Sequence, residues 1–164
     1  MMPINPRTVT FITTYRCNAA CEQCCFECNP TRSSKLTAAE VKWFIDDIST
    51  TYPSIKSAVF SGGECFLLGK ELFECITHAN QRGLSTRCVT NGFWGSSSAT
   101  ALRLATLARR SGLNEINFST GQDHEKWVPI QSVINAAEAC LSQGIATLIT
   151  VEKDSDDGDR FNKL

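Results

Sequence analysis

A strand-and-helix pattern repeats along this chain about every thirty residues, the length of a crossover unit that joins two parallel strands. β-Branched and apolar runs begin near Ala58, Thr86, Glu115 and Ile145, and an earlier run covers residues 9–13. Segments with apolar residues at helical spacing separate these runs. Right-handed crossovers coil such units toward a barrel. The sequence therefore predicts an α/β fold with a parallel sheet of five β/α units, arranged as a partial, open TIM-type barrel.

The intervening segments carry helix boundary signals. Thr37 and Glu40 have the spacing of a capping box, and a helix is expected from there to Thr50. A second helix should end at Gly83, and a third should cover about residues 98–111. Pro129 suits the first turn of a fourth helix.

Five of the nine cysteines lie within residues 17–28. Cys17, Cys21 and Cys24 have the spacing C-x3-C-x2-C, and thiolates this close together are typical of iron–sulfur ligands. Three thiolates leave one iron of a cubane cluster open to a small ligand. Cys21, Cys25 and Cys28 repeat the same spacing, so a second register stays open, as does a structural zinc knuckle. The chain shows no secretion signal, which favours metal-binding thiols over disulfides.

The loop Cys-Asn-x-x-Cys-x-x-Cys after an apolar strand, followed by Gly62-Gly63-Glu64, resembles the radical S-adenosylmethionine (radical SAM) enzymes over roughly residues 8–151. The resemblance implies a [4Fe-4S] cluster on Cys17, Cys21 and Cys24, with S-adenosylmethionine (SAM) on the open iron. It also implies reductive cleavage of SAM to a 5′-deoxyadenosyl radical that abstracts hydrogen from a substrate.

The resemblance further implies a set of SAM contacts. The turn beginning at Ser61 should meet the SAM amino group, with the Glu64 carboxylate balancing its charge. The remaining expected contacts are Gln23 beside the adenine, and Asn91 and Ser119 near the methionine or ribose. All of these follow strand ends, where ligands gather in parallel α/β folds. Each also has a simpler interpretation as a turn or cap residue.

Other polar and thiol groups leave their roles open. Cys65 stands where the family often has proline, and is either a thiol near the site or a small packed side chain. Cys25 and Cys28 are free for a second role in the preferred register. Asp123 and His124, in a polar loop, either contact substrate or are solvated.

Composition sets broad limits. The 164 residues and net charge of −1 suit one domain and give no charge-based reason to expect a nucleic-acid partner or an anionic membrane. No apolar run reaches the length of a membrane span, so we expect a cytoplasmic protein. We expect a core over residues 1–153 and a flexible acidic tail over residues 154–164.

The partners follow from the resemblance. A reduced flavodoxin- or ferredoxin-type protein should donate the electron, and a peptide or protein is the expected substrate. The family barrel has six units and this chain supplies five, so the strand at residues 145–151 should be an open edge that pairs with a partner, a second copy or a further segment. The alternative function is a non-catalytic iron–sulfur or zinc binding module, or a fragment of a longer radical SAM enzyme.

Overall fold

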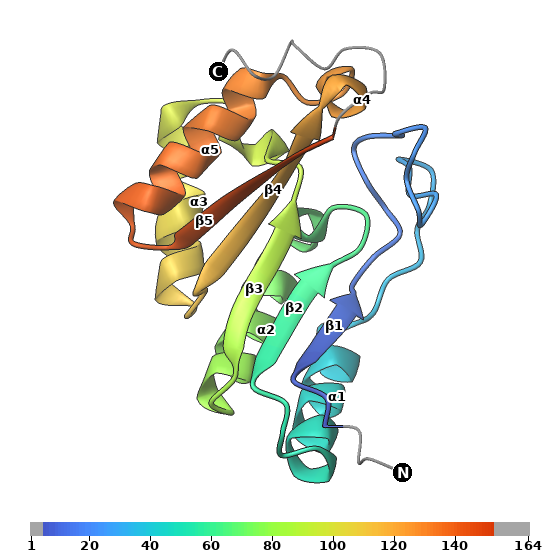
Figure 1. Cartoon of the computed structure of the whole chain (residues 1–164), viewed down its shortest axis with the longest axis vertical. Coiled ribbons are helices and arrows are strands. Elements are labelled where there is room, and N and C mark those ends of the chain that lie inside the picture. Colours follow the sequence, from blue (N-terminus) through green and yellow to red (C-terminus); the bar gives the residue numbers. More distant parts are fainter. Residues whose placement is uncertain (1–4, 153–164) are drawn as a thin grey trace.

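A single five-stranded parallel sheet organises the chain, as the computed structural model shows for residues 5–152 (Figure 1). The strands neighbour one another in chain order: β1 (Thr8–Ile12), β2 (Ser57–Ser61), β3 (Ser85–Thr90), β4 (Glu115–Gly121) and β5 (Ala146–Glu152). All four pairings are parallel, and β1 and β5 do not pair with each other. The prediction of a parallel, open partial barrel is confirmed.

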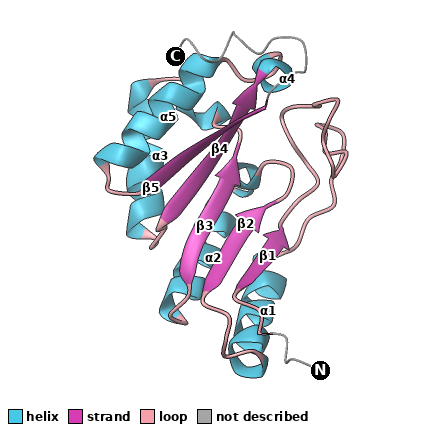
Figure 2. Cartoon of the chain, viewed as in Figure 1, coloured by secondary structure: helices cyan, strands magenta, loops and turns pink. Residues whose placement is uncertain are grey.

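Four longer helices cover one face of this sheet (Figure 2). They are α1 (Ala38–Thr51), α2 (Lys70–Gln81), α3 (Ser98–Arg110) and α5 (Ile130–Ser142). The predicted capping box is present at α1: the Thr37 hydroxyl accepts the Glu40 N–H at 3.2 Å, and the Glu40 carboxylate accepts the Thr37 N–H at 2.7 Å. Within residues 5–152, no helix combines the length and apolar character that a membrane span requires.

The core lies between the sheet and these helices. Phe60 of β2 and Phe118 of β4 are fully buried in one apolar cluster with Ile45 of α1 and Ile76 of α2. The apolar side chains pack between the helices and one face of the sheet. Polar groups lie at the carboxyl ends of the strands, which form one rim of the sheet.

Three short elements at that rim were not predicted. The turn η1 (Cys65–Leu68) follows β2, the turn η2 (Phe93–Gly95) follows β3, and the short helix α4 (Gln122–Glu125) occupies what we expected to be a polar loop after β4. The acidic segment 154–164, expected to be a flexible tail, lies outside the described residues.

Candidate functional site

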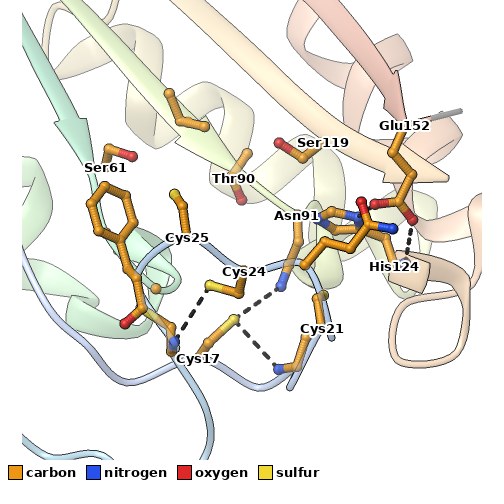
Figure 3. Close-up of a pocket in the computed structure, with 17 residues that line it drawn as sticks. Cys17, Cys21, Cys24, Cys25, Ser61, Thr90, Asn91, Ser119, His124 and Glu152 are labelled. Carbon is orange, nitrogen blue, oxygen red and sulfur yellow. Dashed lines mark hydrogen bonds and ion pairs between the residues drawn. The ribbon is translucent and has the colours of Figure 1, made fainter.

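A pocket of about 270 Å³ lies where the cysteine loop meets the carboxyl ends of the strands (Figure 3). The cysteine loop, residues 17–28, forms one side. The ends of β2, β3 and β4 contribute Ser61, Thr90 and Ser119, and Glu152 of β5 lies at the far side. Every predicted cluster ligand and SAM contact except Glu64 lines this pocket: Cys17, Cys21, Gln23, Cys24, Ser61, Gly62, Gly63, Asn91 and Ser119.

The Gly-Gly turn after β2 holds the base of the cysteine loop. The Gly63 N–H donates to the Thr14 carbonyl at 2.6 Å, and the Glu64 N–H donates to the Arg16 carbonyl at 3.0 Å. A Cβ on Gly62, whose φ is +135°, would lie 2.5 Å from the Thr14 oxygen, and one on Gly63 would overlap the Arg16 carbonyl. Glycine is required at both positions because the loop backbone approaches so closely.

Glu64 does not face the pocket, which differs from the expected contact with a SAM amino group. It is fully buried, and its carboxylate accepts the Phe66 N–H at 2.9 Å, the Thr90 hydroxyl at 2.8 Å and the Asn91 N–H at 2.7 Å. Burial raises the pKa of this carboxyl to about 7, while the same donors act to lower it. The side chain therefore connects the turn after β2 to the end of β3.

Asn91 lines the pocket and also contacts the cysteine loop. Its side-chain N–H group donates to Asn18 Oδ1 at 2.9 Å and lies 3.7 Å from Cys17 Sγ. Its Oδ1 accepts the Phe93 N–H at 3.1 Å. The Ala19 N–H approaches the same Cys17 sulfur at 3.4 Å. Two N–H groups thus point at the first cysteine of the motif.

The thiols of the loop lie in one neighbourhood. Cys24 Sγ accepts the Cys28 N–H at 3.4 Å. The pKa of Cys21 is raised to about 12, mainly by burial. Nearby carboxylates and the thiols of Cys17 and Cys24 contribute to this rise. Burial likewise raises the pKa of Cys17, and that of Cys28 to about 11. Cys25 is exposed. Both registers remain at the pocket, but the sulfurs of Cys17 and Cys24 already accept N–H groups, as cluster thiolates do.

The cysteine loop supplies thiol donors of the kind that the implied cluster needs. Within residues 5–152, no three His, Cys, Asp or Glu side chains are grouped closely enough to hold a single metal ion. An iron–sulfur cluster spreads its thiolates over several irons, so it does not need that close grouping. Five thiols from one loop, with N–H groups directed at two of them, fit a cluster in their donor chemistry.

The opposite wall of the pocket holds a pair that sequence reasoning assigned only in part. His124 was considered as a substrate contact, but Glu152 was missed. The Glu152 carboxylate accepts the backbone N–H groups of Asp123 and His124, the latter at 3.0 Å, and its other oxygen lies 3.1 Å from His124 Nδ1. Gly121 admits this carboxylate, because a Cβ there would overlap Glu152 Cγ. Glu152 ends the fifth strand, so the strand-end rule that placed Asn91 and Ser119 at this edge of the sheet could have found it.

The α4 turn also reaches the cysteine loop. Lys126 Nζ lies 3.2 Å from a carboxylate oxygen of Glu22 in the loop and 3.2 Å from one of Asp123, which is largely buried. These ion pairs connect the residues beside Cys21 to the end of β4. The cysteine loop therefore contacts the segments that follow β2, β3 and β4.

Known proteins resemble this chain in sequence and in fold. No family model matches the chain. It is 26% identical over 132 residues to YydG of Bacillus subtilis (strain 168), a protein whose name assigns it to peptide biosynthesis. That match covers 80% of this chain and 41% of YydG, so the chain spans less than half the length of this relative.

Solved structures share the fold. A structure of anSMEcpe with bound AdoMet, which is SAM, superposes with a TM-score of 0.72 at 16% identity, covering 96% of this chain and 47% of that one. A complex of anSMEcpe with AdoMet and the Cp18Cys peptide gives 0.71 at 17% identity, covering 96% and 45%. BtrN in complex with AdoMet and 2-DOIA gives 0.58 at 14% identity, covering 91% and 58%.

Proposed function

We propose that this chain, which is related to the radical SAM superfamily, binds a [4Fe-4S] cluster through Cys17, Cys21 and Cys24 and binds SAM in the adjoining pocket. One observation carries the proposal: the three thiols, the Gly-Gly turn and the ends of three strands line a single pocket. The fold neighbours with bound AdoMet support it.

Backbone and side-chain N–H groups of this chain position the thiols that would hold the cluster. A bound, reduced cluster held by Cys17, Cys21 and Cys24 would supply the electron for cleavage of SAM to methionine and a 5′-deoxyadenosyl radical, the species that would abstract hydrogen from a substrate. The Asn91 and Ala19 N–H groups hold the Cys17 sulfur, and the Cys28 N–H holds that of Cys24. The Gly62-Gly63 backbone keeps the loop against β2.

The electrostatics of the pocket suit the charge of SAM. Among the described residues that line it there is no lysine or arginine, whereas Glu152 contributes a carboxylate and the loop contributes thiols. Such a lining favours the sulfonium and ammonium groups of SAM over anionic ligands. The carboxylate of SAM would then have the iron that the three cysteines leave open as its partner.

A peptide is the proposed substrate, and a reduced flavodoxin- or ferredoxin-type protein the proposed electron donor. Two observations on other proteins support the peptide: anSMEcpe has been solved with a peptide bound, and the name of YydG assigns it to peptide biosynthesis. A pocket whose described lining holds no lysine or arginine is consistent with a neutral or cationic segment of such a peptide.

The test is anaerobic reconstitution with iron and sulfide, followed by reduction in the presence of SAM and assay for 5′-deoxyadenosine. We expect about four irons and four sulfides per chain and formation of 5′-deoxyadenosine. Cys24→Ala should lose both, whereas Cys75→Ala, which removes a buried thiol on α2, should keep both. A chain that retains only zinc and incorporates no sulfide would instead support the non-catalytic binding module.

A further inference from the structure

We propose that Glu64 is a positioning residue that acts through Asn91 on Cys17. Its buried carboxylate fixes the end of β3, and the Asn91 side chain extends from there to the first cysteine of the loop. The proposal rests on the proposed function only in naming Cys17 a cluster ligand. The contacts themselves belong to the chain without a cluster.

The Glu64 carboxylate acts as the acceptor in each of its hydrogen bonds. Oε1 accepts the Phe66 N–H and the Thr90 hydroxyl, and Oε2 accepts the Asn91 N–H. A carboxylate can accept at both oxygens, whereas the amide of glutamine accepts at only one. The site is therefore built for glutamate, although glutamine has nearly the same volume.

The direction of the Thr90 hydroxyl is determined by its other partners. Thr90 Oγ1 accepts the Gly92 N–H at 3.1 Å and the Trp94 Nε1–H at 3.2 Å, so its own hydrogen is left to donate to Glu64 at 2.8 Å. Trp94 is buried and packs against Phe66 at a ring distance of 4.8 Å. The carboxylate thus joins η1, the end of β3 and η2.

The orientation of the Asn91 amide is determined in the same way. Because Oδ1 accepts the Phe93 N–H, the Nδ2 group is the one directed at the loop, where it meets Asn18 Oδ1 and Cys17 Sγ. The backbone N–H of Glu64 also donates to the Arg16 carbonyl. One residue therefore holds the start of the cysteine loop by its backbone directly and by its side chain through Asn91.

Pulsed alkylation of the full, cluster-free chain tests this arrangement, with iodoacetamide as the probe and mass spectrometry of each cysteine as the readout. Cys17 is nearly buried in the wild type, so its labelling reports opening of the loop. In Glu64→Gln we expect Cys17 to react about tenfold faster, since a buried donor loses its acceptor. The rates of Cys25, which is exposed, and Cys75, on α2, should not change.

A double-mutant cycle of Glu64→Gln and Asn91→Ala tests whether Glu64 acts on Cys17 through Asn91. Asn91→Ala alone should raise the Cys17 rate by a similar factor, and the double variant should react no faster than either single variant. Glu71→Gln, on the surface in an ion pair with Lys35, is the matched control and should behave as the wild type.

A folded Glu64→Gln chain with wild-type reactivity at Cys17 would overturn the inference. So would rates that multiply in the double variant, because the two residues would then act independently. If Glu64→Gln does not fold, Asn91→Ala alone decides. Unchanged Cys17 labelling in that variant contradicts the contact from Asn91 to Cys17, and faster labelling supports it. Because no cluster is present, these results are independent of whether the chain cleaves SAM.

Discussion

The side-chain nitrogen of Asn91 lies 3.7 Å from the sulfur of Cys17, although 74 residues separate the two in the chain. Asn91 directly follows β3, and Cys17 begins the cysteine loop after β1, so the contact crosses over the end of the intervening strand β2. Hydrogen bonds to cluster sulfurs tune their reduction potential. The sheet order thus places an N–H donor beside Cys17, one of the proposed cluster ligands.

The register of the cluster ligands is the first prediction. Cys17→Ala, Cys21→Ala and Cys24→Ala should each abolish cluster binding, because the proposed site holds the cluster by these three thiolates alone. Cys25→Ala and Cys28→Ala should retain it, as measured by iron and sulfide content after reconstitution. Loss of the cluster in Cys28→Ala with retention in Cys17→Ala would identify the overlapping triad as the true one.

Glu64 should make stability depend on pH. Its pKa is about 7 in the folded chain against an ordinary value of 4.5, so the folded state binds the proton more tightly. The stabilisation is fully present below pH 4.5 and is lost as pH rises through 7, by about 3 kcal/mol for this group. Urea unfolding of the cluster-free chain should show the wild type losing this amount relative to Glu64→Gln. A constant difference in unfolding free energy between the two proteins would contradict the assignment.

The tautomer of His124 is the third prediction. Glu152 accepts at Nδ1, so neutral His124 should carry its proton there and leave Nε2 as an acceptor. His78, the other of the two histidines in the chain, meets Asp46 through Nε2 at 2.7 Å and should show the opposite tautomer. Nitrogen-15 NMR of the two imidazoles distinguishes these states. Glu152→Ala should remove the preference of His124 only; an unchanged His124 pattern would show that Glu152 does not set it.

The edge strand β5 should recruit a neighbour. Its side chains Leu148, Ile149 and Val151 are 42–50% exposed, on both faces of the strand. Unpaired edges with apolar side chains tend to associate. In solutions of this chain the available neighbour is a second copy, so sedimentation velocity should show self-association that Ile149→Lys weakens. Leu102→Lys, at an equally exposed site on α3, is the control; an equal effect of both variants would exclude β5 as the specific surface.

Periodicity and boundary signals were enough to predict the fold. The β-branched runs gave strand positions to within two residues, and the Thr37–Glu40 spacing gave the start of α1. The strand-end rule also predicts that Ser61, Asn91 and Ser119 lie at one edge of the sheet, and all three line one pocket. These features depend on local sequence and on the handedness of the crossovers, both of which the sequence contains.

The direction of individual polar side chains was not predictable in this way. Glu64 points inward because η1 begins directly after it and because the end of β3 presents donors to it, a relationship between segments 26 residues apart. Glu152 meets His124 only through the register of β4 against β5. Such pairings depend on tertiary contacts that spacing patterns do not encode.

The most direct test of the central claim is the electron paramagnetic resonance spectrum of the reconstituted, reduced chain, recorded before and after addition of SAM. We predict the signal of one reduced [4Fe-4S] cluster, and a change in that signal on addition of SAM, because in the proposed site SAM would bind the iron that Cys17, Cys21 and Cys24 leave open. A cluster signal that SAM leaves unchanged, or the absence of a cluster signal, would contradict the account.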